Sequence, residues 1–139
     1  MGIRIDRVVK SPGTFSGGKA YSLIVDGDQL YLIEVGPGST ELFQRGANFV
    51  AQAGIDKARQ RMLAKIEPGE KRLAEMGPEA ISVEKGSFKF ALSEVYQFEY
   101  GKNLYGYFQL KLKAGKQKMT LYVAGIYEPG LDQIAALVR

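Results

Sequence analysis

Apolar and polar residues alternate along much of the chain, and this alternation predicts a protein built largely of β-strands. Residues 3–9 alternate in this way, and residues 20–35 contain two apolar runs that flank Asp26 and Gly27, a pair favoured in two-residue hairpin turns. From residue 81 onward, short alternating stretches recur between turn signals, which predicts a β-meander. Its strands are expected at residues 81–83, 88–92, 95–100, 104–113 and 119–123.

A helical periodicity separates the two β-rich regions. Apolar residues between positions 42 and 66 recur at steps of three and four, which predicts an amphipathic helix that begins at Ser39 or Thr40. Gly54 is expected to bend or divide this helix, and Pro68 to end it and open a shorter helix at 69–76.

The order of these elements predicts an α+β fold in a single domain, residues 1–139. We expect an antiparallel β-barrel or sandwich of about seven strands, with a helical insertion at about residues 39–77. Apolar residues within 131–138 recur at helical spacing, so a C-terminal helix is expected to cap an open end or face of the sheet. A parallel βαβ sheet is disfavoured because the helices are inserted between strands and do not alternate with them.

Composition argues against common kinds of catalysis. The chain has no His and no Cys, so it lacks the most frequent general base, the most frequent metal ligand and the most reactive nucleophile. We therefore expect a binding module that is not an enzyme, with no metal and no cofactor. Charged residues interrupt the apolar N-terminal stretch and no apolar run is long enough to span a bilayer, so a cytoplasmic location is expected.

Residues 13–20, GTFSGGKA, have the glycine and lysine spacing of a phosphate-binding loop. Ala20 stands where such loops carry Ser or Thr, and the sequence that follows predicts a strand and not a helix. A connecting loop is therefore the better interpretation.

The net charge of +4 is unevenly distributed, and basic residues gather in two places. No Asp or Glu lies between Glu99 and Glu128, and the last predicted hairpin carries the principal candidate anion-binding residues, Lys111, Lys113, Lys116 and Lys118. The same lysines would also suit an edge strand protected from aggregation. A secondary basic group on the inserted helix consists of Lys57, Arg61 and Lys65 at four-residue spacing.

Four segments together suggest a family. The hairpin AYSLIVDGDQLYLIEV, the phrase ALSEVYQFEYGKN, the strand pair YFQLKLKAGKQKMTLYVAG and the final LDQIAALVR resemble bacterial pleckstrin-homology-like and GRAM-like domains. The resemblance implies a partly open β-barrel or sandwich plugged by a C-terminal helix. It also implies a scaffold for lipid, peptide or self-association, without catalytic residues. The chain departs from this pattern in its long helical insertion and in the absence of Trp from its final helix.

These observations predict a module for protein interaction, self-association or binding to an anionic membrane surface. A protein partner or a homo-oligomer formed through the inserted helices is the first expectation, and an anionic membrane the second. The alternative is single-stranded nucleic-acid binding by a Tyr- and Lys-bearing sheet face. That face would contain Tyr105, Tyr107, Lys111 and Tyr122.

Overall fold

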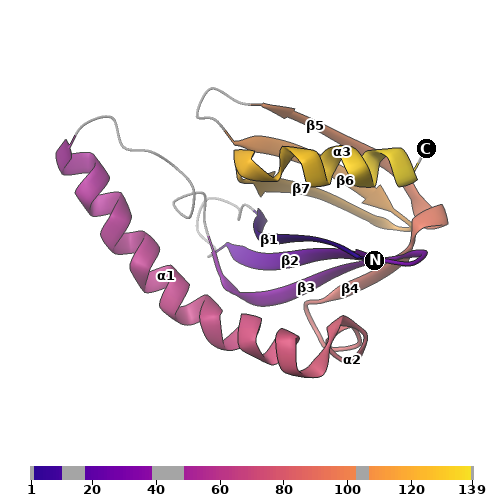
Figure 1. Cartoon of the computed structure of the whole chain (residues 1–139), viewed down its shortest axis with the longest axis horizontal. Helices are drawn as coiled ribbons and strands as arrows, with labels where there is room; N and C mark the ends of the chain where they lie inside the picture. The colour runs from indigo at the N-terminus through magenta and orange to yellow at the C-terminus, as the bar shows by residue number, and fades with distance from the viewer. Residues whose placement is uncertain (1, 11–17, 39–48, 103–106, 139) are drawn as a thin grey trace.

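A computed structural model describes residues 2–10, 18–38, 49–102 and 107–138. Figure 1 shows a curved antiparallel sheet with a long helix on one side and a short C-terminal helix across its opening. The strands are β1 (Ile3–Lys10), β2 (Lys19–Asp26), β3 (Gln29–Pro37), β4 (Phe88–Ala91), β5 (Val95–Lys102), β6 (Phe108–Ala114) and β7 (Gln117–Val123). The helices are α1 (Phe49–Met76), α2 (Pro78–Ser82) and α3 (Glu128–Leu137), with 3₁₀ turns η2 (Leu92–Glu94) and η3 (Gly125–Tyr127).

The seven strands form one sheet in the order β4-β3-β2-β1-β7-β6-β5. All of the neighbouring pairs are antiparallel, and the sheet does not close, so β4 and β5 are its edges. A short pairing of β1 with β7, at Val9↔Tyr122 and Lys10↔Leu121, joins the β1–β4 half to the β5–β7 half. The predicted α+β class and antiparallel strand arrangement are confirmed.

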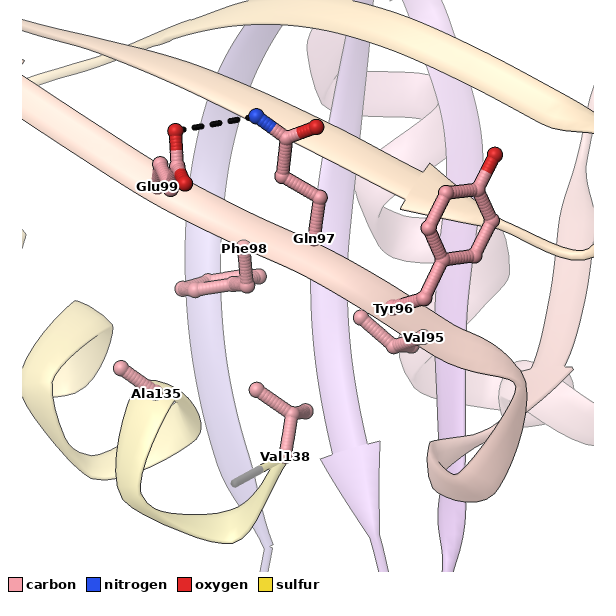
Figure 2. Close-up of a pocket in the computed structure, with 7 residues that line it drawn as sticks. All are labelled: Val95, Tyr96, Gln97, Phe98, Glu99, Ala135 and Val138. Atoms are coloured by element: carbon pink, nitrogen blue, oxygen red, sulfur yellow. Dashed lines mark hydrogen bonds between the residues drawn. The ribbon is translucent and has the colours of Figure 1, made fainter.

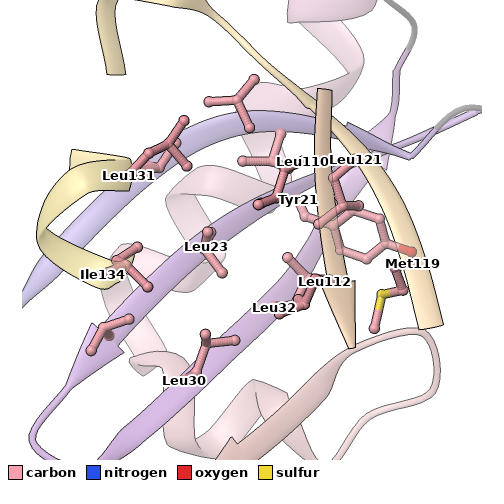
Figure 3. Close-up of a cluster of buried hydrophobic side chains, with 14 of the residues drawn as sticks. Tyr21, Leu23, Leu30, Leu32, Leu110, Leu112, Met119, Leu121, Leu131 and Ile134 are labelled. Atoms are coloured by element: carbon pink, nitrogen blue, oxygen red, sulfur yellow. The ribbon is translucent and has the colours of Figure 1, made fainter. Parts of the chain in front are cut away.

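The larger hydrophobic cluster lies on the concave side of the sheet. Figure 3 shows Leu23 and Leu32 from one half of the sheet and Leu112 from the other half in this cluster. Leu131 and Ile134 of α3 are fully buried against these strands. The C-terminal helix therefore covers the core between the two halves, as the sequence pattern predicts.

A second hydrophobic cluster lies on the outer side of the β1–β4 half. Ile66 and Leu73 of α1, together with Ile81 of α2, pack there against residues such as Ile33 of β3. Ile66 and Leu73 are seven residues apart, so they lie on the same face of the helix. The N-terminal part of α1 extends beyond the strands in Figure 1.

The prediction that Pro68 ends the helix is wrong. Pro68 lies inside α1, a helix of 28 residues that ends only at Met76. An interior proline costs about 3 kcal/mol in a helix, but burial of a large aliphatic side chain contributes about 1.5–3 kcal/mol. Ile66 and Leu73 are buried on either side of Pro68, and their burial offsets the cost of the interruption.

Two other local predictions need correction. Residues 81–83 are not a strand: Pro78–Ser82 form α2, in which Pro78 occupies the start of the helix and Ile81 is buried. The β2–β3 turn is centred on Gly27 and Asp28, one residue later than predicted, because Asp26 pairs with Gln29. Gly27 has φ 62°, which suits glycine at the first central position of a type II′ turn. The predicted helix start at Ser39 or Thr40 lies outside the described residues.

Candidate functional site

The hairpin β6–β7 carries the four principal lysines. Lys113 of β6 lies directly opposite Lys118 of β7, and Lys111 of β6 lies opposite Thr120. These side chains alternate with buried residues such as Leu112, so Lys111, Lys113 and Lys118 lie on the outer face of the sheet. Lys116 lies at the tip of the hairpin, in a two-residue turn opened by Gly115 with φ 56°.

This outer face is not covered by any of the described helices. Helices α1 and α2 pack on the outer side of β3, whereas α3 packs on the concave side of the sheet against β1 and β5 (Figure 1). Gln109, Lys111, Lys118 and Thr120 are accordingly exposed. We define the lysine face as Lys111, Lys113, Lys118 and the hairpin-tip residue Lys116.

Two shallow hollows adjoin on the lysine face. One has a volume of about 140 Å³ and is lined by Lys111, Lys113, Lys118, Met119 and Thr120. The other, of about 320 Å³, is lined by Glu99, Gly101, Lys102, Gln109 and Lys111. Lys111 is common to both. Glu99 is the acidic side chain in these linings and lies opposite Lys111 in the β5–β6 register.

The edge-strand explanation does not fit Lys111 and Lys113. Their strand β6 pairs with β5 on one side and with β7 on the other. Strand β7 pairs with β1 only at Leu121 and Tyr122 among the described residues, so Lys118 precedes the part of β7 that has two partner strands. Lysines protect a sheet from aggregation when they lie on an edge strand, where backbone groups are unpaired. Lys111 and Lys113 therefore need another explanation.

The secondary basic group lies on a different part of the molecule. Lys57, Arg61 and Lys65 are exposed on α1, which packs against β3 in one half of the sheet, whereas the lysine face belongs to β6 and β7 in the other half. Arg59 on the same helix forms an ion pair with Asp56 at 3.3 Å. The two basic groups therefore form separate surfaces and do not converge on one ligand.

The structure does not bring the predicted stacking residues into an open platform. Tyr105 lies outside the described residues. Tyr107 is only 8% exposed, and its ring packs edge-to-face against Tyr122 with 5.7 Å between the centroids. Since a nucleic-acid base stacks on an accessible ring face, this arrangement weakens the nucleic-acid alternative.

A third surface feature, which the sequence did not predict, lies between β5 and α3. Figure 2 shows a pocket bounded by residues 95–99 of the edge strand and by Ala135 and Val138 near the end of α3. Its volume is about 270 Å³. The alternation of residues 95–100 predicts a strand, but its position at the sheet edge depends on pairings distant in sequence.

A polar network connects α2 to the sheet. The Tyr31 hydroxyl donates a hydrogen bond to the Glu79 carboxylate, which also accepts one from Lys89 at 2.5 Å. The bond to Glu79 raises the pKa of Tyr31 to about 12, while Lys89 and then Tyr31 lower the pKa of Glu79. Each group has a partner that stabilises the protonation state it has at neutral pH, so this network fits a structural role.

Two further findings concern metals and membranes. Within the described ranges, no group of three or more Asp or Glu side chains is arranged to hold a metal ion. None of the described helices is long and apolar enough to cross a membrane.

Comparisons of the chain with models of known protein families, with curated proteins and with solved structures find no match. The arguments for function therefore rest on the geometry of this molecule.

Proposed function

We propose that this protein is a non-enzymatic binding module of pleckstrin-homology-like architecture, and that its lysine face binds an anionic membrane surface. The architectural part is supported by two sheet halves that enclose a core and by a C-terminal helix across their opening. This arrangement fits the partly open barrel or sandwich that the sequence resemblance implies.

The observation that carries the proposal is a cluster of lysines on the β6–β7 hairpin, on a sheet face that none of the described helices covers. Lys113 and Lys118 are direct cross-strand neighbours, a like-charged arrangement that is destabilising in the absence of an anion. An anionic surface relieves this repulsion, and each lysine near such a surface contributes about 1 kcal/mol to binding. Lys116 at the hairpin tip extends the same basic surface.

Co-sedimentation with vesicles tests the proposal. The wild-type protein is expected to pellet with phosphatidylserine-containing vesicles, to pellet poorly with phosphatidylcholine alone, and to be released as salt rises. The variant Lys113→Gln/Lys118→Gln is expected to lose about 2 kcal/mol of binding, or about 30-fold in the partition coefficient at low salt.

The matched control is Lys57→Gln/Arg61→Gln, which removes the same charge from the exposed face of α1. This variant is expected to retain most of the binding. If both double variants lose the same amount of vesicle binding, a general effect of net charge explains the result. The proposal that the lysine face is the binding site is then wrong. If the wild-type protein binds neither kind of vesicle at low salt, the membrane proposal is wrong.

A further inference from the structure

Among the strands that the structure describes, none lies beside one long edge of β5. It pairs with β6 along one side and is the last strand in the sheet order. An edge strand presents a row of backbone N–H and C=O groups that can pair with another extended chain. At eight residues, β5 is twice as long as β4, the edge strand at the other end of the sheet.

The two edges differ in their surroundings. At the short edge, Lys89 of β4 is held in the network with Glu79 of α2, and α2 packs against the neighbouring strand β3. At the long edge, α3 leaves the pocket of about 270 Å³ beside residues 95–99. This volume is slightly below the range of roughly 300–1,000 Å³ that is typical of small-molecule sites, and it suits one or two side chains.

Apolar side chains are exposed at this edge. Tyr96 is 61% exposed, because a register shift between Val95 and Gln97 interrupts its pairing with β6. Leu137, which precedes Val138 at the end of α3, is 51% exposed. The long edge thus combines a side of β5 that has no described partner strand, a pocket and apolar surface, which are the features used when a peptide adds a strand to a sheet.

We propose that the β5 edge binds an extended segment of a partner protein, which adds to the sheet as an eighth strand beside α3. The pocket determines the chemistry of that segment. In Figure 2, Phe98, Ala135 and Val138 lie on the α3 side of β5, whereas Gln97 and Glu99 lie on the opposite side. Because successive side chains of a strand point to opposite faces, the segment carries an apolar residue toward Val138 and polar residues toward Gln97 and Glu99.

A selection from a displayed library of random peptides, followed by binding measurements on the enriched sequences, tests this proposal. Enriched peptides are expected to alternate apolar and polar residues. Their binding is expected to slow hydrogen exchange at backbone amides within residues 95–102, as observed by NMR. N-methylation at alternate peptide positions is expected to abolish binding, while N-methylation at the intervening positions is tolerated, because only every second residue donates to β5.

Two single variants locate the site. Tyr96→Lys and Val138→Arg are each expected to weaken binding of the enriched peptides by about tenfold or more. The matched control is Ile126→Lys, since Ile126 is 82% exposed and lies outside the pocket lining. Thermal unfolding of each variant establishes that its fold is retained, and Tyr96 in particular is too exposed to be needed for the core.

Three outcomes would overturn the proposal. In the first, the selection yields no peptide that binds the wild-type protein better than the Tyr96→Lys variant. In the second, N-methylation weakens binding of the enriched peptides equally at every position. The free protein could also form a dimer whose β5 amides are protected, in which case a second copy of this chain occupies the edge. The membrane proposal is independent of all three, because neither Tyr96 nor Val138 belongs to the lysine face.

Discussion

Among individual residues, Glu70 shows how a charged group can be retained at a packed surface. It lies on α1 with its side chain 18% exposed, and its carboxylate is 3.7 Å from the guanidinium of Arg7. Burial raises the pKa of Glu70, and the opposing influence of Arg7 is smaller. Arg7 lies in a bulge of β1 and has φ 58°, a conformation that is costly for a residue other than glycine. Because the cost of burying the Glu70 charge exceeds its attraction to Arg7, we expect the ion pair to contribute little to stability.

The variant Glu70→Gln tests this conclusion through the pH dependence of unfolding. A carboxyl group whose folded-state pKa is raised contributes stability below its unfolded pKa and loses that contribution as pH rises through the folded-state pKa. We expect Glu70→Gln to be as stable as wild type at pH 7 or more stable, by about 1 kcal/mol at most, because the desolvated charge is removed. This advantage should shrink as pH falls toward 4.5, the ordinary pKa of the group.

Urea unfolding between pH 4 and pH 7 measures the effect, and the exposed neighbour Glu67→Gln serves as the control for loss of one negative charge from α1. A Glu70→Gln protein that is clearly less stable than wild type at pH 7 would contradict the interpretation and would show that the Arg7 ion pair is stabilising.

The placement of most residues on inner or outer faces follows from the sequence, because alternation is a local property. The lysine face is an example: alternation with buried residues places Lys111 and Lys113 on one side of β6. Whether these lysines protect a sheet edge or form a binding surface could not be predicted from that pattern. It depends on which strands flank the hairpin and on which faces the helices cover. Strand β5 flanks β6 on one side, and β7 joins the other half of the sheet by pairing with β1 across more than a hundred residues of sequence.

At the scale of elements, α1 shows that the environment of a glycine determines the effect of replacing it. At Gly69 an added Cβ would lie 2.1 Å from the carbonyl oxygen of Val35 in β3. At Gly54, near the projecting end of the same helix, an added Cβ would meet nothing within 4 Å. Gly69 therefore allows α1 to approach the sheet closely, whereas Gly54 only lowers the helix propensity.

These two positions give predictions of opposite sign. Gly54→Ala is expected to stabilise the protein or its helix by about 0.5–1 kcal/mol, because alanine is the better helix former. Gly69→Ala is expected to destabilise the protein by about 1–3 kcal/mol, because α1 must move away from β3. Thermal or urea unfolding followed by circular dichroism measures both changes. If Gly69→Ala stabilises the protein to the same degree as Gly54→Ala, α1 does not pack closely on β3.

The helical elements were the least predictable from sequence. Local rules place a helix end at Pro68, but the contacts of Ile66 and Leu73 with the sheet continue α1 beyond it. Local rules also read Ile81 and Val83 as a strand, although Pro78 can equally begin a helix. In both cases the deciding interaction is burial against β3, which is distant in sequence and outside the reach of periodicity.

At the scale of the whole molecule, one sheet is shared by two hydrophobic clusters. The concave cluster contains Leu23 of β2 and Leu131 of α3, and the outer cluster contains Ile24 of β2 and Leu73 of α1. Adjacent residues of a single strand thus contribute to different clusters. Loss of either cluster removes packing from the same strands, so we expect the two clusters to unfold together.

Equilibrium unfolding of the Leu131→Ala variant tests this coupling. Leu131 is fully buried, and truncation to alanine is expected to cost about 2–5 kcal/mol, a large part of the roughly 5–15 kcal/mol that stabilises a typical domain. The loss arises in the concave cluster, where α3 packs. Nevertheless, two unfolding midpoints should fall by the same amount. One is reported by the helix signal in circular dichroism, which is dominated by the longer α1, and the other by tyrosine fluorescence.

Leu73→Ala, in the outer cluster, is the matched comparison and should lower both midpoints in the same way. Separate midpoints for the two signals in either variant would show that α1 and the concave core are independent units.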